Sequence, residues 1–329
     1  MKKLVVFAAS MLSCFLVYSQ EADDSGRSVG LSFIPRIDLS TGSTLGDSSF
    51  YTLVEGDINE YFSFSICNHW WSAEDPQDLY KNTLYTNGNT WTDWANLTIH
   101  LGSFDLTGGK MVMAMGGFEF DEYDYEVHSI QCSQLWNNLA CYQWGGQISW
   151  TDPSEHNQFV AQMTTSPYGI RPVKSKVFTY SLQWRGNYGP LETIWSGTRL
   201  DQNWKKKTST YLVTLGQRVS AGDFTLGFDW FNKVGVYDDE LDTVEDSILE
   251  KGNTFIGSVL YAPSEKWEVY AKGGYETGYI GDWFGGLAFH WYPLKDSKDL
   301  RVHATAGYSL DETVFSIGAI YHLNFPRKK

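Results

Sequence analysis

The sequence has 329 residues, of which 16% are aromatic and 19% are charged, and its formal net charge is -14. Its mean hydropathy of -0.32 excludes a helical membrane protein, which would need several apolar runs of about 18 or more residues. The aromatic content excludes a disordered chain, and the excess of acidic residues argues against nucleic acid as a partner.

The N-terminus has the pattern of an export signal. A short basic start, Met1–Lys3, precedes the almost unbroken apolar run Leu4–Tyr18. We expect cleavage after Ser19, which leaves residues 20–329 as a single domain. Cys14 offers an alternative lipoprotein cleavage site, but the apolar run continues beyond it.

Three cysteines remain after the predicted cleavage: Cys67, Cys132 and Cys141. An odd number excludes a complete disulfide framework. Cys132 and Cys141 are close enough in sequence to pair in an oxidising compartment. The alternative is that they are small unpaired thiols packed in a wall. No histidine accompanies them at ligand spacing, so we expect no metal and no cofactor.

The rest of the chain alternates apolar and polar residues over stretches of about 9 to 13 residues, the length of a tilted membrane strand. The alternation is clearest near the C-terminus, where Phe315, Ile317 and Tyr321 share one face and the polar side chains share the other. A polar lumen, an apolar exterior and aromatic belts at both interfaces are typical of outer-membrane β-barrels. The alternation therefore predicts an all-β, antiparallel transmembrane barrel in the outer membrane, ending its last strand at Phe325.

Short polar turns and longer connections divide this pattern into sixteen strands. Barrels of this kind place short turns on the periplasmic side and longer loops outside. The predicted tight turns are 57–60, 152–155, 187–189, 220–223, 263–265 and 295–298. The predicted longer connections are 40–49, 71–91, 116–138, 167–174, 199–207, 236–250, 278–281 and 310–312.

The segment from Leu97 to Pro167 resembles the phosphate-selective porin family (porins O and P) of outer-membrane channels. The residues that carry the resemblance are Phe104–Lys110, Met115–Glu119, Gly145–Trp150 and Gln158–Pro167. The resemblance implies a barrel of 16 strands, a homotrimer, and a third outer loop that folds inward to narrow the pore. By the strand count, this third loop is 116–138.

The charges of the predicted pore differ from those on which the family's anion selectivity depends. The third loop has no Lys or Arg, and it contains five acidic residues, Glu119, Asp121, Glu122, Asp124 and Glu126. The alternation turns a mostly basic wall toward the lumen: Lys110, Arg185, Arg218, Lys233, Lys272, Arg301 and His303, with Asp229, Glu268 and Glu276. An acidic loop facing a basic wall would create a transverse field and a preference among ions. The alternative is that these charges pair and hold the loop against the wall.

We therefore expect a passive channel for ions and small hydrophilic solutes, in contact with outer-membrane lipid and lipopolysaccharide. The second acidic run, 236–250, is interpreted as a solvated surface loop, with a divalent cation bridging to lipopolysaccharide as the alternative. No G-x-S-x-G or H-E-x-x-H motif is present, so we expect no enzyme. Two alternatives remain: a secreted β-protein that binds or hydrolyses carbohydrate, and a closed barrel that acts as an adhesin or structural protein.

Overall fold

A computed structural model describes residues 27–41, 46–72, 91–169, 175–235, 251–278 and 281–325. Most of these residues lie in antiparallel strands, and the described residues contain no helix long and apolar enough to cross a membrane. The strands are β1 (Ser28–Ser40), β2 (Ser49–Asn59), β3 (Phe62–Ser72), β4 (Trp91–Leu101), β5 (Phe104–Val112), β6 (Tyr142–Thr151), β7 (Asn157–Thr165), β8 (Phe178–Tyr188), β9 (Leu191–Asn203), β10 (Thr208–Ala221), β11 (Phe224–Gly235), β12 (Gly252–Ser264), β13 (Trp267–Glu276), β14 (Trp283–Trp291), β15 (Leu300–Ser309), β16 (Glu312–Tyr321) and β17 (Leu323–Phe325).

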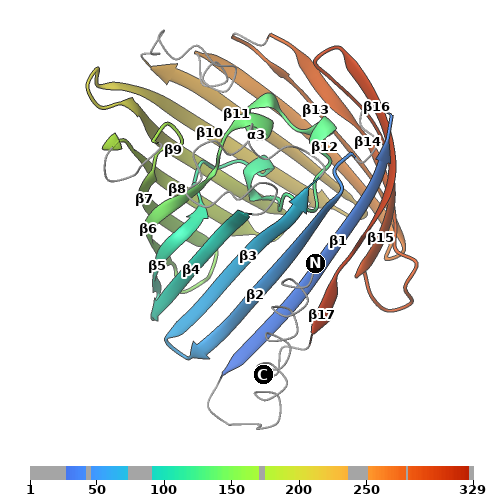
Figure 1. Ribbon diagram of the computed structural model, residues 1–329, viewed down its shortest axis with the longest axis horizontal. Helices are drawn as coiled ribbons and strands as arrows, with labels where there is room; N and C mark the ends of the chain where they lie inside the picture. The colour runs from blue at the N-terminus through green and yellow to red at the C-terminus, as the bar shows by residue number, and fades with distance from the viewer. Residues whose placement is uncertain are drawn as a thin grey trace, which may run out of the picture.

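The sheet closes on itself as a barrel (Figure 1). Each strand from β1 to β15 pairs antiparallel with its successor, and β1 also pairs with β16 and β17. Arg36 opposes Ile320 and Leu31 opposes Phe325, which is one unbroken register. The short strand β17 is therefore the end of β16 after an interruption at His322, and the wall has 16 strands. This confirms the predicted fold class.

The alternation of side chains assigns the two faces of the wall as the sequence predicts. Phe315, Ile317 and Tyr321 of β16 are exposed on the outside. On the adjacent strand β15, Arg301 and His303 point inward and are buried. Successive residues of a strand point to opposite faces, so one closed sheet presents an apolar exterior and a polar lumen.

Aromatic side chains gather on the outside near the end that carries the short turns. Trp184 of β8 packs edge-on against Trp195 of β9, with ring centroids 5.0 Å apart. Further along the same wall, Phe224 of β11 stacks on Tyr261 of β12 at 4.5 Å, and Tyr261 contacts Trp267 of β13. These rings form the interfacial belt that the composition predicts, because amphipathic rings prefer the boundary between hydrocarbon and water.

Each of the six predicted tight turns falls at or beside a connection between consecutive strands, and they share one end of the barrel. A seventh turn at this end, Gly102–Ser103 between β4 and β5, is missing from the sequence prediction. Gly102 has φ +65°, the left-handed conformation that glycine adopts without steric cost. This turn has only two residues and no proline or acidic residue, so it barely interrupts the alternation of apolar and polar residues from which turns are predicted.

One predicted connection is shorter than expected. The sequence assigned 199–207 to a loop, but β9 continues to Asn203 and β10 begins at Thr208, so the turn is 204–207. Arg199 therefore lies on the outer face of a strand. The predicted signal peptide 1–19, the acidic loop 236–250 and the C-terminal residues 326–329 lie outside the described residues, as do most of 71–91 and part of 40–49.

The apolar exterior can be tested by placing a charge in its centre. Ile317 lies midway along the continuous strand β16–β17 and is exposed. In Ile317→Arg, the charge should lower the free energy of unfolding by about 2–4 kcal/mol, the cost of arginine near the bilayer midplane. The measurement is reversible urea unfolding in phosphatidylcholine vesicles. Leu310→Arg, in the exposed turn between β15 and β16, is the control, and equal losses in both variants would contradict the orientation.

Candidate functional site

The connection between β5 and β6, residues 113–141, runs inside the barrel (Figure 1). We call this segment the inner loop. It contains two short 3-10 helices, η1 (Glu119–Asp121) and η2 (Ser129–Gln131), and one short helix, α3 (Gln134–Asn138). It includes the predicted third loop, 116–138, and confirms that this loop folds into the lumen.

Apolar side chains attach the inner loop to two opposite parts of the wall. The first cluster joins loop residues such as Phe120 and Leu135 to Phe231 of β11 and Phe284 of β14. The second joins Tyr125 to β1–β4, where Tyr51 and Trp94 are buried. Burial of this apolar surface away from water stabilises the loop in one position.

Two wall carboxylates bind backbone N–H groups of the inner loop. Asp229 of β11 accepts hydrogen bonds from the backbone N–H of Phe118 and Glu119, at 2.9–3.0 Å. Glu276 of β13 accepts from Gln134 and Leu135, at 2.6 and 3.3 Å. The first N–H groups of a helix have no partner within the helix, and the predicted lumenal acids Asp229 and Glu276 supply one at the starts of η1 and α3.

Four of the five predicted acidic residues of the loop form ion pairs with predicted basic residues of the wall. The pairs are Glu119–Lys272 at 3.0 Å, Asp121–Arg185 at 2.5 Å, Glu122–Arg218 at 3.8 Å and Glu126–Arg301 at 2.6 Å. The fifth, Asp124, accepts a hydrogen bond from the Tyr142 hydroxyl at 2.9 Å. The wall partners lie on β8, β10, β13 and β15, so the loop is held on several sides of the lumen.

Burial divides these residues into two groups. Glu119 and Lys272 are almost completely buried, and the Glu119 carboxylate also accepts hydrogen bonds from the backbone and hydroxyl of Ser133. Asp121 and Arg185 are each 39% exposed, and Glu122 and Arg218 are about as accessible at 29% and 32%. The second group is therefore accessible from the lumen, whereas the first holds the loop in place.

Lys110 and Lys233 point inward as predicted but are buried. The Lys110 ammonium donates to the carbonyl of Thr92 and lies within the electrostatic influence of Asp93. Glu268 of β13 also points inward and accepts from the Tyr292 hydroxyl at 2.6 Å. These predicted wall residues contribute to the packing of the wall and not to its exposed surface.

Arg36 of β1 is the loop contact that the sequence analysis missed. Its buried guanidinium donates to Asp38 at 2.7 Å and to Asp47 at 3.0 Å. It also donates to the backbone carbonyls of Tyr125 and Val127 in the inner loop. The alternation from Arg36 to Leu39 was a usable signal, because it places Arg36 and Asp38 on the lumenal face.

Three histidines extend this contact between the loop and the wall. His128 of the inner loop lies 3.1 Å from Arg36 through Nδ1 and 3.1 Å from His290 through Nε2, and His303 lies 2.5 Å from Asp38. Burial and the charge of Arg36 hold the pKa of His128 well below its ordinary value. Asp38, His128 and His303 are close enough to share a cation, but Arg36 contacts two of them and already supplies the positive charge.

A second polar chain lies at the short-turn end of the lumen. The hydroxyl of Ser63 on β3 is 2.8 Å from Nε2 of His100 on β4, and Nδ1 of His100 is 2.7 Å from Asp105 on β5. His100 and Asp105 are more than one-third exposed. This is the order of contacts found in serine hydrolases. No motif indicates it, because the three residues meet only through the pairing of three strands.

The cysteines form no disulfide among the described residues. Cys67, Cys132 and Cys141 are all free thiols, so the structure favours the unpaired alternative. Burial raises the pKa of Cys132 and of Cys141, and neither is therefore a reactive thiolate.

No protein-family model matches the sequence, and no curated protein matches it. Solved structures do match. OmpT of Vibrio cholerae, described as an outer membrane protein, is 13% identical with a TM-score of 0.60, over 92% of this chain and 99% of that one. A mutant of the Rh. blastica porin is 10% identical with a TM-score of 0.59, over 90% of this chain and 100% of that one.

At these identities the likeness establishes the fold. The chain has the 16-stranded fold of porins, and its apolar exterior with an aromatic belt places it in an outer membrane. The narrower resemblance to phosphate-selective porins, carried by Leu97–Pro167, stays a prediction.

The contact of Glu126 with the wall should depend on pH. Burial alone would raise the pKa of Glu126, but the hydrogen bond with His322 and the charge of Arg301 outweigh it and lower that pKa. A carboxylate whose pKa is lowered by folding stabilises the protein above its unfolded pKa, about 4.3 for Glu, and loses this effect as the pH falls through the folded value.

Glu126→Gln should therefore lower the free energy of unfolding by about 1–2 kcal/mol at pH 7, after allowance for partial exposure. At pH 3 the difference from the unsubstituted protein should shrink, because Glu126 of the unfolded chain, with a pKa of about 4.3, is then largely protonated. Tryptophan fluorescence during urea unfolding measures both values, with Glu265→Gln in a tight turn as the control. A difference that stays constant between the two pH values would contradict the assignment.

Proposed function

We propose that this protein is a passive outer-membrane channel for ions and small hydrophilic solutes, without enzymatic activity. The observation that carries the proposal is the inner loop, which spans the lumen and presents the exposed pairs Asp121–Arg185 and Glu122–Arg218. Accessible charges of both signs inside the lumen favour a path for hydrophilic solutes over a role in adhesion or support alone. The partners are solutes, outer-membrane lipid and further copies of the chain.

Selection by this channel combines size with charge. The inner loop narrows the lumen, which limits the size of solutes. Asp121 and Glu122 project from the loop, and Arg185 and Arg218 face them from β8 and β10, so the local field runs from wall to loop. Such a field orients dipolar solutes and disfavours apolar ones, and rings of charge set the preference among ions.

We infer a mild preference for cations. The loop carries five acidic residues and no Lys or Arg between 116 and 138, and Arg185 and Arg218 are each paired with one of those acids. The phosphate-selective porins that the segment Leu97–Pro167 resembles need a pore lined with free Arg and Lys. Anion selectivity of that kind is therefore not proposed here.

A homotrimer is proposed on the same grounds as the channel. The resemblance to porins implies it, and the trimer form of OmpT from Vibrio cholerae has this fold, with a TM-score of 0.57 and 13% identity. Cross-linking of the protein in native outer membranes tests the oligomeric state independently of conductance.

Planar-bilayer recording of the purified protein tests the channel. We expect discrete conductance steps and a reversal potential in a salt gradient that indicates cation preference. In the triple variant Asp121→Asn, Glu122→Gln, Asp124→Asn, the preference should shift toward anions, because Arg185 and Arg218 lose their partners. Asp152→Asn in a periplasmic turn is the control. Absence of steps would refute the channel, and an unchanged permeability ratio in the triple variant would refute the role of these acids.

A hydrolase is the second candidate, because Ser63, His100 and Asp105 have the contacts of a catalytic triad. In such a site the Ser63 hydroxyl would attack an ester carbonyl while His100 takes its proton and passes it to the leaving alcohol. Water would then release the acid and restore Ser63.

Covalent labelling by a fluorophosphonate probe, followed by peptide mass spectrometry, distinguishes this candidate. A hydrolase would be labelled at Ser63 in the unsubstituted protein and unlabelled in Ser63→Ala. Ser65→Ala is the matched control, since Ser65 is the next lumenal serine on β3 and donates to Glu55. We expect no labelling at Ser63, in agreement with a channel, and labelling there would overturn the non-enzymatic part of the proposal.

A further inference from the structure

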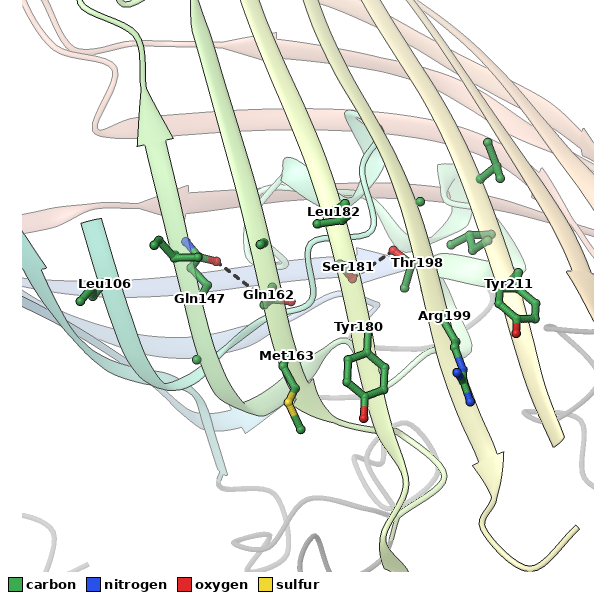
Figure 2. A pocket seen from close by; sticks show the side chains of 16 residues that line it. Leu106, Gln147, Gln162, Met163, Tyr180, Ser181, Leu182, Thr198, Arg199 and Tyr211 are labelled. Atoms are coloured by element: carbon green, nitrogen blue, oxygen red, sulfur yellow. Dashed lines mark hydrogen bonds between the residues drawn. The ribbon is translucent and has the colours of Figure 1, made fainter. Parts of the chain in front are cut away.

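The outer surface of the barrel contains a groove across β5 to β10, with a volume of about 690 Å³ (Figure 2). Small residues on three of these strands, Gly146, Ala161 and Gly197, leave the depression open. Exposed larger side chains, including Met163 and Leu182, border it. The groove faces away from the lumen, so it is separate from the proposed channel.

Three side chains lie side by side at the end of the groove nearest the outer loops. Tyr180 of β8 opposes Arg199 of β9, which in turn opposes Tyr211 of β10 (Figure 2). Arg199 donates through Nε to Asp201 Oδ1 at 2.9 Å, and its Nη2 forms an ion pair with the same oxygen at 2.9 Å. A guanidinium has five N–H donors, so most of its capacity remains for a second partner.

The rim beyond Arg199 is strongly basic. The turn between β9 and β10 carries the exposed residues Lys205, Lys206 and Lys207. The Lys176 ammonium lies 5.9 Å from the ring centroid of Trp204 in that turn, which brings the preceding outer connection to the same place. Residues 175–178 and 199–209 together contain five basic residues and a single acid, Asp201.

We propose that this groove binds a phosphorylated, acylated glycolipid of the outer leaflet. One acyl chain would occupy the apolar groove, and Arg199 with the lysine rim would bind the phosphate. Arginine binds phosphate through charge-assisted, often bidentate hydrogen bonds, and basic clusters at a membrane surface attract anionic lipids. The groove then anchors the barrel at the outer interface through β5–β10.

Charge complementarity favours this lipid over a second copy of the chain. An apolar strand face of another subunit could fill the groove, but it offers no phosphate and no acidic row to the rim. The sequence indicates a solvated surface loop at 236–250, and a divalent cation that bridges this loop to lipopolysaccharide is only the alternative. The groove uses a different part of the chain and opposite charges.

Native mass spectrometry of the full-length protein in detergent, titrated with diphosphorylated lipid A, tests the proposal. Arg199→Gln should weaken binding about tenfold, the loss expected for one charge-assisted hydrogen bond. Gly197→Leu should fill the groove and weaken binding at least as much. A Cβ at Gly197 meets no atom within 4 Å, so this variant leaves the wall undisturbed.

The controls are matched to each variant. Gly257→Leu places the same side chain on the outside of β12, where a Cβ also meets no atom within 4 Å. Lys266→Gln removes a charge from a tight turn at the opposite end of the barrel. Both controls should bind lipid A as the unsubstituted protein does. Channel conductance does not enter the measurement, so failure here is distinguishable from failure of the channel.

Four outcomes would overturn the proposal. If Arg199→Gln and Gly197→Leu both bound lipid A as tightly as the unsubstituted protein, the groove would be excluded as the binding site. If the unsubstituted protein bound dephosphorylated lipid A as tightly as diphosphorylated lipid A, recognition of the phosphate would be excluded. If inorganic phosphate alone displaced lipid A, the basic rim would be a general anion site and not a site for the lipid. Loss of self-association in Gly197→Leu with unchanged lipid binding would make the groove a subunit interface.

Discussion

Closure of the hydrogen-bonded sheet is the constraint on which this structure depends. Hydrocarbon offers no partner for a backbone N–H or C=O group, so a sheet that crosses a membrane cannot have an open edge. The pairing of β1 with β16 and β17 removes that edge. Once the sheet is closed, the period of two residues sends half of the side chains into a lumen, and their chemistry becomes independent of the lipid outside.

The lumen of this barrel is occupied by charges that have partners. A buried charge is costly unless it is paired and hydrogen-bonded. Asp229 and Glu276 are compensated by N–H groups of the inner loop, and Arg36 by loop carbonyls and two aspartates. The charged residues of the wall therefore fix the position of the inner loop, and the loop in turn compensates those charges. Opposite charges that could have created a wide field across the lumen are instead in contact, and only the partly exposed pairs remain accessible from the lumen.

Periodicity explains what was predictable. Apolar and polar residues alternate along each strand, so the lumenal and outer faces of β15 and β16 can be predicted from their sequences alone. The turn Gly102–Ser103 carries two residues and no repeated pattern, and it was missed. Arg36 was missed for a different reason: its partners in the inner loop are about 90 positions away. Ser63, His100 and Asp105 likewise meet only because β3, β4 and β5 lie in one register.

The sequence by itself determined the barrel, the number of its strands, the orientation of its two faces and the presence of an acidic segment after β5. These are local properties, set by alternation and by the turns that interrupt it. The tertiary structure alone decided that Glu119 is buried against Lys272 while Asp121 is exposed beside Arg185, and that Arg199 lies beside a groove on the outside. Such differences depend on which strands become neighbours when the sheet closes, and residues two positions apart in one loop can then meet different walls of the same lumen.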